Sequence, residues 1–409
     1  MSRATLASAA LLIFLVSLAC PAQTSQAPPA PRSATVPFLL EDNRVFVDLT
    51  FTKPNGSPRS AHFLVDTGGG GFLMAEPLAR DLGLDLSGKP MEEDGAKFLA
   101  VTPPAVRIGN LPLDMKDARV LVMMGQKTIQ DGFNHAEGML PGHVLQRYQV
   151  VIDYGTQRFT LALPGTLKMR GTRLNTPVQQ HTGFPRLEAT IAGKSYGFLL
   201  DCGAAYTMIS QNVLDEWAKA HPEWPRATGA VGAPNMGVPM EVGLEVTRVP
   251  QMLLGPLQLR AIGMVARRKG IFEDRMSPAM TGPIAGAIAG NVLRNYRVQI
   301  DYAEGATYLE KIGNPSPNAN DLDVVGLILQ PGPDGSFTVL GVAQKDGKPV
   351  VEGIEKKDRL LKIEGRDVVG KTLQEVLQSL QGKPGEIRHL VLEREGKPVT
   401  IAAPVVHLL

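Results

Sequence analysis

This chain of 409 residues contains few cysteines and histidines and has almost no net charge. Only Cys20 and Cys202 are present, so no cysteine cluster offers a zinc site, and loss of Cys20 with a cleaved leader excludes a disulfide. The seven histidines show no metal-binding spacing. The formal net charge is +2 and no basic run stands out, which argues against nucleic acid as a partner.

Long hydrophobic runs are also missing, except at the amino terminus. Leu11–Val16 lies in an apolar stretch that is short for a membrane span and is followed by small residues, which is typical of an export signal. We expect cleavage after Ala22, so that residues 1–22 are a signal peptide and the protein is periplasmic or secreted. The alternative is a lipoprotein anchored through Cys20, although Ser17 stands where a leucine is usual. We favour export without the lipid anchor, and we predict no transmembrane span.

Two short stretches end an apolar run with an aspartate. Phe63–Gly68 reads Phe-Leu-Val-Asp-Thr-Gly, and Phe198–Gly203 reads Phe-Leu-Leu-Asp-Cys-Gly. Each run predicts a buried strand, and the small residue and glycine after the aspartate let the chain turn sharply. A carboxylate at the end of a buried strand is costly unless it is paired, hydrogen-bonded or protonated. One such motif alone is most often a plain turn after a strand.

A second pair of stretches shows that the chain contains an internal duplication. Residues 138–154 align without a gap with residues 286–302, and nine of the 17 positions are identical, where chance gives roughly one or two. Each stretch follows its own aspartate motif, so the repeated unit has roughly 130 residues. Two such units are expected to pack face to face, with the aspartates in one cleft between them. Asp66 and Asp201 would then share one proton and activate a water molecule.

Around the motifs, alternating residues predict strands, and 43 Gly with 32 Pro indicate many turns. Short helices are expected at residues 77–84 and 213–220. Residues 23–35 are rich in Gln, Ala, Pro, Ser and Thr and predict a linker, with order beginning near Val36. A second linker is expected at residues 314–318.

These elements resemble the aspartic proteases of the pepsin and retropepsin type, in their bacterial two-repeat form. The resemblance covers residues 36–312 and is carried by the doubled aspartate motif, by Ile288-Ala289-Gly290 and by the closing Ile-Asp-Tyr strands. It implies a mainly β fold with two β-barrel lobes in tandem, at residues 36–165 and 172–312. It also implies catalytic Asp66 and Asp201, and no metal or organic cofactor.

The resemblance further implies that Thr67, Gly68, Cys202 and Gly203 support the catalytic loops. Three departures from the family pattern stand out. Cys202 replaces a threonine or serine whose hydroxyl ties the two loops together, and a thiol is a weaker donor. Pro141 stands where the second copy has alanine, and neither Gly69 nor Ala204 carries the hydroxyl that pepsins often place after the glycine. No flap tyrosine is identifiable.

Residues 321–409 have a different character and resemble a small α+β PDZ domain of the bacterial, circularly arranged kind. The resemblance is carried by Gly353-Ile354, by Asp358-Arg359-Leu360-Leu361, by a helix expected at residues 373–380 and by a hairpin through Glu395-Gly396. It implies that a peptide carboxyl terminus adds beside an edge strand. The candidate peptide-binding residues are Gly326, Leu327 and Ile328. A packing module without a free peptide ligand is the alternative.

The leading hypothesis from the sequence is an exported aspartic endopeptidase that acts on protein or peptide substrates, with the PDZ-like segment recruiting substrates or regulating activity. The second hypothesis is a catalytically inactive, protease-like peptide-binding protein, and Cys202 motivates it. Nucleotide binding by the glycine run 68–71 is a weak third hypothesis, because no phosphate-loop lysine follows it.

Overall fold

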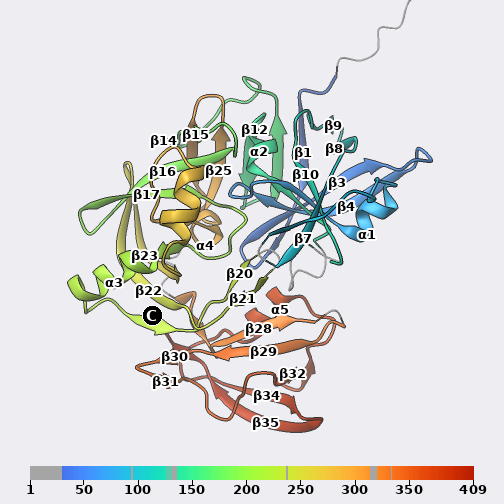
Figure 1. The fold of residues 1–409 in the computed structure, drawn as a ribbon. Coiled ribbons are helices and arrows are strands. Elements are labelled where there is room, and N and C mark those ends of the chain that lie inside the picture. Colours follow the sequence, from blue (N-terminus) through green and yellow to red (C-terminus); the bar gives the residue numbers. More distant parts are fainter. Residues whose placement is uncertain are drawn as a thin grey trace, which may run out of the picture. The chain divides into compact units, whose positions relative to one another are not determined.

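The computed structural model describes residues 30–93, 95–126, 129, 136–235, 238–313, 320–332 and 334–409. The expected signal peptide with Cys20, most of the amino-terminal linker and the linker at 314–318 lie outside the described residues. Within the described residues, no helix is both long and apolar enough to cross a membrane. The expectation of a mainly β chain is confirmed, because strands far outnumber helices along the described segments (Figure 1).

The first repeat (residues 36–165) places most of its strands in one sheet of ten strands. The order is β6-β7-β10-β5-β11-β4-β3-β8-β9, and β2 pairs with β3. The strands are β2 (Leu39–Glu41), β3 (Arg44–Thr52), β4 (Pro58–Asp66), β5 (Phe72–Ala75), β6 (Met91–Glu93), β7 (Ala96–Val101), β8 (Val106–Ile108), β9 (Leu111–Pro112), β10 (Val120–Met123) and β11 (Gly138–Pro141).

The second repeat (residues 172–312) supplies eight strands of another sheet of ten, in the order β15-β16-β17-β24-β18-β23-β22-β19-β30-β31. Its last two strands come from the region after the repeat. The strands are β15 (Val178–Gln179), β16 (Phe184–Ile191), β17 (Lys194–Leu200), β18 (Met208–Ser210), β19 (Arg226–Thr228), β22 (Glu245–Leu254), β23 (Leu257–Arg267), β24 (Gly286–Ile288), β30 (Gln344–Lys345) and β31 (Lys348–Pro349). A separate hairpin joins β20 (Ala233–Asn235) to β21 (Val238–Glu241).

The two sheets repeat one pattern of strand pairing around the aspartate motifs. In the first repeat, β11 runs parallel to β4 and antiparallel to β5, which is itself parallel to β10. In the second, β24 runs parallel to β17 and antiparallel to β18, which is parallel to β23. The sequence duplication is therefore also a duplication of topology, and the strand before each aspartate pairs with the repeated strand that begins at Gly138 or Gly286.

A third sheet joins the two repeats directly. Its order is β1-β13-β12-β25-β26-β14, with β1 (Ser33–Pro37), β12 (Gln149–Asp153), β13 (Arg158–Ala162), β14 (Thr172–Asn175), β25 (Tyr296–Asp301) and β26 (Ala306–Lys311). Val151 faces Gln299, the residue 148 positions later, which is its own counterpart in the second copy. The repeats are thus paired about a local two-fold axis. The first strand starts at Ser33, earlier than the expected onset of order, because Ser33 pairs with Ala162.

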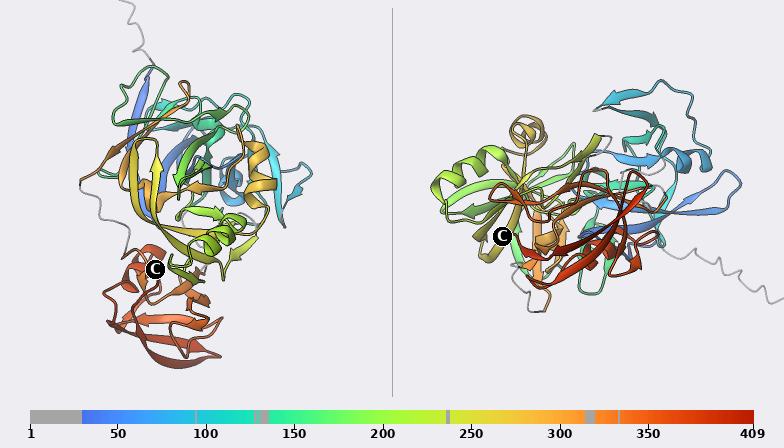
Figure 2. Two further views of the ribbon diagram at one scale, coloured as in Figure 1. Left: turned by 90° about the vertical axis from the view of Figure 1, so that its left-hand side faces the viewer. Right: turned by 90° about the horizontal axis from the view of Figure 1, so that it is seen from below.

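The region of residues 321–409, hereafter the C-terminal region, forms a smaller sheet in the order β28-β29-β32-β34-β35, with β33 against β32. Figure 2 shows this sheet in orange to red from two directions. The strands are β28 (Leu327–Pro331), β29 (Phe337–Val342), β32 (Arg359–Ile363), β33 (Arg366–Asp367), β34 (Ile387–Arg394) and β35 (Lys397–Pro404), and β27 (Asp323–Val324) pairs with β36 (Val406–His407). The hairpin expected through Glu395-Gly396 is confirmed.

The helices are short and lie at the ends of strands. They are α1 (Glu76–Asp81), α2 (Gly142–Leu145), α3 (Gln211–Ala220), α4 (Gly290–Leu293) and α5 (Leu373–Ser379), with a π-helix η1 (Ile271–Met276) and a 3-10 turn η2 (Ser277–Ala279). Helix α3 begins two residues before the expected start because the Ser210 hydroxyl caps it, accepting a bond from the Asn212 N–H at 3.1 Å. Helix α5 begins at the expected residue, where Thr372 and Glu375 form a capping box.

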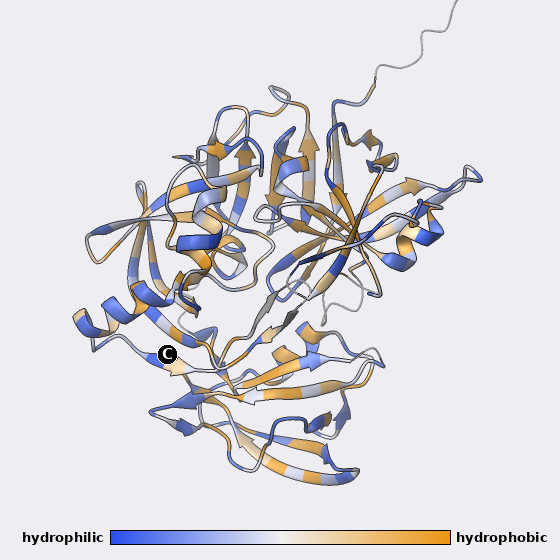
Figure 3. Ribbon diagram, viewed as in Figure 1, coloured by the Kyte–Doolittle hydropathy of each residue, from blue (hydrophilic) through white to orange (hydrophobic). Residues whose placement is uncertain are grey.

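The hydrophobic residues gather along the strands, and hydrophilic residues gather in the outer turns and on α3 (Figure 3). The largest core cluster contains residues of both repeats, among them Val65 and Leu200 beside the aspartate loops. The C-terminal region has its own cluster around Phe337. A further cluster packs Leu408 and Leu409 against Tyr206 of the second repeat. The C-terminal region is therefore packed onto the second repeat, which it also extends through β30.

Candidate functional site

The structure brings the two sequence-predicted aspartates together at matching strand ends. Asp66 is the last residue of β4, and Asp201 follows the last residue of β17. Each carboxylate lies against the loop of the other: a methyl group added at Gly68 would lie 2.9 Å from Cγ of Asp201, and one added at Gly203 would overlap Asp66. The two loops therefore form one site.

The sharp turn expected after each aspartate is present at residues 67–68 and 202–203, although neither Gly68 nor Gly203 has a positive φ. What excludes a side chain is the close approach of the opposite carboxylate. Gly69 is constrained within its own loop, since a methyl group there would lie 2.6 Å from Cε of Met139 and 2.9 Å from Oδ2 of Asp66.

Thr67 and Cys202 tie the two loops together by bonds that cross between the repeats. The Thr67 hydroxyl donates to the carbonyl of Leu200 at 2.7 Å and accepts from the Cys202 N–H at 3.0 Å. In the reverse direction, the Cys202 thiol donates to the carbonyl of Val65 at 3.4 Å. Both side chains are buried. The thiol thus takes the place of a hydroxyl, and burial, as the largest cause, raises the pKa of Cys202 to about 12, so it remains a donor.

The hydrogen bonds to the two carboxylates are unequal. Oδ1 of Asp201 accepts from the N–H groups of Gly203 at 2.9 Å and Ala204 at 3.1 Å. Oδ1 of Asp66 accepts from the Gly68 N–H at 2.9 Å. Because hydrogen bonds from N–H groups favour the ionised carboxylate, Asp201 is better suited to carry the negative charge.

The pKa values of the two carboxyl groups follow the same asymmetry. Burial, as the largest cause, raises the pKa of Asp66 well above its ordinary value, and the Asp201 charge and a hydrogen bond to Asp201 raise it further. Burial also raises the pKa of Asp201, but the N–H groups of Gly203 and Ala204 and the bond with Asp66 lower it. The protonated form is therefore favoured more strongly at Asp66, and the ionised form at Asp201.

Arg44 also belongs to the site, and no sequence motif marks it. Its Nε donates to the carbonyl of Gly203 at 2.9 Å, and its Nη1 donates to Asp42 at 2.6 Å. The side chain is buried, and its charge lowers the pKa of both Asp66 and Asp201. In the sequence, an arginine after the turn Asp42-Asn43 is indistinguishable from an exposed strand residue.

Two hairpins, one from each repeat, border the aspartates and were also missed. The first joins β6 to β7 around Gly95, and the second joins β20 to β21. Glu93 and Phe98 of the first and Met240 and Glu241 of the second line the same cavity as the aspartates. The Asp-Gly pair at 94–95, which favours a tight hairpin turn, is the signal that identifies the first of them.

The cavity over the aspartates has a volume of about 960 Å³ and apolar patches on both sides. The patch from the first repeat consists of Leu73, Phe98, Leu121 and Met139. The patch from the second repeat consists of Leu199, Met208, Phe272, Met276 and Ala287. Between the patches lie two hydrogen-bonded carboxyl groups, an arrangement that suits an extended polypeptide with apolar side chains.

The candidate peptide-binding residues of the C-terminal region lie in a different cavity. Gly326, Leu327 and Ile328 face helix α5 across a space of about 480 Å³. They are not part of the lining around Asp66 and Asp201.

Among the described residues, no group of three or more His, Cys, Asp or Glu side chains is arranged to hold a metal ion. No family model matches this chain, and no curated protein matches it either.

Proposed function

We propose that this protein is an aspartic endopeptidase that hydrolyses peptide bonds in protein or peptide substrates. The observation that carries the proposal is the pair of aspartates, Asp66 and Asp201, which two repeated loops hold in one site where the pKa of each carboxyl group is raised. Two carboxyl groups that share a proton are suited to combined base and acid catalysis.

The asymmetry of the pair assigns the roles. Ionised Asp201 takes a proton from a water molecule held between the carboxyl groups, and the resulting hydroxide attacks the scissile carbonyl carbon. Protonated Asp66 donates its hydrogen bond to the carbonyl oxygen, where negative charge develops. The tetrahedral intermediate then collapses, the proton held by Asp201 passes to the leaving amine, and the C–N bond breaks.

The remaining parts of the site support this chemistry. Thr67 and Cys202 fix the separation of the two loops, and Gly68 and Gly203 permit their approach. The apolar patches on either side offer binding energy for the side chains next to the scissile bond. The water and the two carboxyl groups complete the reaction as written, so the proposal includes no metal and no organic cofactor.

We further propose that residues 36–165 and 172–312 are two pepsin-like or retropepsin-like lobes and that residues 321–409 are a PDZ domain. The matched pairing of β4, β5 and β11 with β17, β18 and β24 supports the first part. The sheet with edge strand β28 and helix α5 supports the second. The amino-terminal sequence supports export, to the periplasm or the medium.

The rival hypothesis of an inactive peptide-binding protein was motivated by Cys202. The thiol donates to the carbonyl of Val65, which mirrors the bond from the Thr67 hydroxyl to Leu200. Since the loop is held in spite of the substitution, Cys202 gives no reason to expect an inactive enzyme.

The test is incubation of the mature protein with a peptide library, with and without a transition-state analogue inhibitor of aspartic proteases. We expect inhibitor-sensitive cleavage between apolar residues, identified by mass spectrometry of the products. The matched control is Asp201→Asn, which keeps the size and hydrogen-bonding oxygen of the side chain but removes the base. Cleavage that persists in Asp201→Asn, or that ignores the inhibitor, would refute the proposal.

A further inference from the structure

The cavity over the aspartates carries different charges on its two sides. Its lining contains six basic and four acidic residues, and two of the four are Asp66 and Asp201. The first repeat supplies two of the basic residues, which are far apart in the chain, and the second repeat supplies four that lie within nine residues of one another. The two are Arg44 and Arg119, and the four are Arg267, Arg268, Lys269 and Arg275. The basic side chains are therefore concentrated on the side of the second repeat.

The strand register shows which residues take the same places in the first repeat. Strands β5, β10 and β11 of the first repeat pair as β18, β23 and β24 do in the second. The second repeat has three basic residues where the first has uncharged ones: Arg267, Arg268 and Lys269 stand in the places of Met123, Met124 and Gly125. Since the first repeat forms the same strands without these charges, the fold does not require them, and a role in binding is the better explanation.

Glu241 holds two of the arginines in place. Its Oε2 accepts from Nε of Arg267 at 3.0 Å, and its Oε1 accepts from Nε and Nη2 of Arg268 at 2.9 and 2.6 Å. Glu241 and Arg267 are buried, whereas 73% of the Arg268 side chain is exposed. One carboxylate thus serves two guanidinium groups, and these three residues, hereafter the Glu241 cluster, keep one positive charge. An arginine has five N–H donors, so its bonds to Glu241 leave Arg268 others for a second carboxylate.

The other acidic residues near the Glu241 cluster are directed away from the cavity. Asp215 pairs with Lys269 at 3.0 Å, Glu273 bonds to the start of helix α3, and Glu245 pairs with an arginine of β19. All three lie within the described residues, and none of them lines the aspartate cavity. Asp215 therefore balances Lys269, while the charge of Arg268 stays available to a ligand in the cavity.

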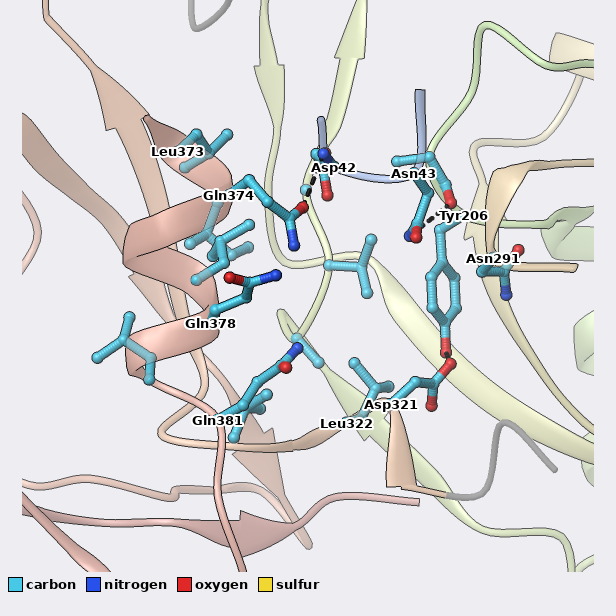
Figure 4. Close-up of a pocket in the computed structure, with 18 of the residues that line it drawn as sticks. Asp42, Asn43, Tyr206, Asn291, Asp321, Leu322, Leu373, Gln374, Gln378 and Gln381 are labelled. Atoms are coloured by element: carbon cyan, nitrogen blue, oxygen red, sulfur yellow. Dashed lines mark hydrogen bonds between the residues drawn. The ribbon is translucent and has the colours of Figure 1, made fainter. Parts of the chain in front are cut away.

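The basic residues of the first repeat are placed differently. Arg44 is buried, and it donates to Asp42 and to a carbonyl of the second aspartate loop. Asp42 is held in turn, because its N–H donates to the side chain of Gln374 in α5 at 2.8 Å (Figure 4). Arg44 is thus committed to the aspartate loops. Arg119 shares its side of the cavity with Glu93, so the charges of that side balance.

A row of apolar residues separates the aspartates from the Glu241 cluster. The row crosses four neighbouring strands, lines the cavity throughout and consists of Leu199, Ala287, Met208 and Val265. Arg267 is two residues beyond Val265, hence on the same face of β23, and its Nη1 donates to Sδ of Met208 at 3.3 Å. Three strand spacings amount to about 14 Å, which an extended peptide spans with about four residues.

We infer that this protein selects polypeptides that carry an aspartate or glutamate about four residues from the cleaved bond, on one side of the bond only, and that Arg268 binds this carboxylate. Glu241 and Arg267 orient Arg268, and the apolar row receives the substrate residues between the cleaved bond and the acidic one. The inference rests on the proposed endopeptidase function and adds a substrate class to it.

The first experiment uses the cleavage sites found in the peptide library. We expect Asp and Glu to be enriched at one position, about three to five residues from the cleaved bond and on one side only. A fluorogenic peptide with Glu at that position should have a kcat/KM at least about tenfold above that of the same peptide with Gln, because Gln loses a charge-assisted interaction. No enrichment of acidic residues, or equal kcat/KM for the two peptides, would overturn the inference.

Variants of Arg268 separate this contact from a general effect on activity. Arg268→Met introduces the residue of the first repeat and should bring the Glu-to-Gln ratio of kcat/KM close to one. Arg268→Glu should reverse the preference, so that a peptide with Lys at that position is cleaved faster than the one with Gln. The matched control is Arg260→Met, an exposed arginine of the same strand that is not in the cavity lining, and it should keep the full ratio. A full preference for Glu in Arg268→Met would show that Arg268 is not the contact.

The inference and the proposed function fail in different ways. Cleavage that requires Asp201 but ignores the acidic residue refutes only the inference, and cleavage that does not require Asp201 refutes the proposed function. If no peptide is cleaved, fluorescence anisotropy decides the binding step with two labelled peptides: four leucines with two glutamates on each side, and the same peptide with glutamines. The inference predicts at least about tenfold tighter binding of the glutamate peptide, and equal binding would overturn it.

Discussion

In the first aspartate loop the residue after the aspartate is Thr67, and in the second it is Cys202. Both side chains nevertheless make the same hydrogen bond. Each donates to the backbone carbonyl of the residue that precedes the aspartate of the other loop. The two loops differ in the number of backbone hydrogen bonds to the carboxylates: Asp201 accepts from two backbone N–H groups and Asp66 from one. A duplicated loop can therefore keep its geometry while its two carboxyl groups acquire different roles.

The largest expected effect on activity is that of replacing either aspartate. Asp201→Asn removes the proposed base and Asp66→Asn the proposed acid, and each should lower kcat/KM by at least about 10³-fold. The measurement is hydrolysis of a fluorogenic peptide, with circular dichroism to show that each variant is folded. A variant with close to normal kcat/KM would remove that aspartate from the mechanism.

Substitution of Thr67 should lower the stability of the protein more than substitution of Cys202. Thr67→Val leaves two buried groups without a partner, the carbonyl of Leu200 and the N–H of Cys202, and should cost about 2–4 kcal/mol. Cys202→Val removes the thiol, a weaker hydrogen-bonding group, from the carbonyl of Val65 and should cost about 1 kcal/mol. Urea unfolding measures both. Equal losses of unfolding free energy in the two variants would mean that Thr67 and Cys202 contribute equally to stability.

Cys202→Thr gives the second loop the residue of the first, and it tests whether the thiol limits activity. Because the Cys202 thiol already bonds to Val65, Cys202→Thr should change kcat/KM by less than about tenfold. A rise from no activity to normal turnover would instead support the inactive, peptide-binding alternative.

Arg44 acts on both aspartates, so its removal should shift the pair together. The guanidinium favours the ionised carboxylates, and Arg44→Gln should therefore raise both pKa values and move both limbs of the pH–rate profile to higher pH. Loss of the bond to Gly203 should also lower kcat roughly tenfold. Arg44→Lys keeps the charge and serves as the control. Limbs that stay in place in Arg44→Gln would contradict this role.

The smallest expected effect concerns the stability cost of the raised pKa values. Because burial raises the pKa of Asp66 above the ordinary value of 3.8, the folded protein is penalised as the pH rises through that higher pKa. Asp66→Asn removes the penalty and should raise Tm at pH 7 by about 1–3 °C, with the gap closing below pH 3.8. Asp201→Asn should gain less, since its N–H donors already favour the ionised form. A gap for Asp66→Asn that does not depend on pH would contradict this origin.

The sequence was sufficient for the parts of the site that the duplication marks. Comparison of residues 138–154 with 286–302 led to two repeats with one shared site, and the structure pairs these repeats through Val151 and Gln299. The apolar runs before Asp66 and Asp201 placed both aspartates at strand ends.

The rest of the site depends on contacts between residues far apart in the chain. Arg44 reaches Gly203 across the boundary between the repeats, and nothing in its sequence surroundings encodes that contact. The cavity beside Gly326 is lined by residues of β28 and α5, which are far apart in the sequence and are brought together by the fold of the C-terminal region. The turns at Gly68 and Gly203 were predicted, but the approach of the opposite carboxylate to each glycine is visible only in three dimensions.

The central claim is that Asp66 and Asp201 act as one unit, and kcat/KM of the two single variants and the double variant tests it most directly. Groups that act as a unit lose their function together, so Asp66→Asn, Asp201→Asn and the double variant should show the same loss, at least about 10³-fold. If one single variant keeps most of its activity, or if the double variant shows the product of two independent losses, the two carboxyl groups do not share one reaction and the account is wrong.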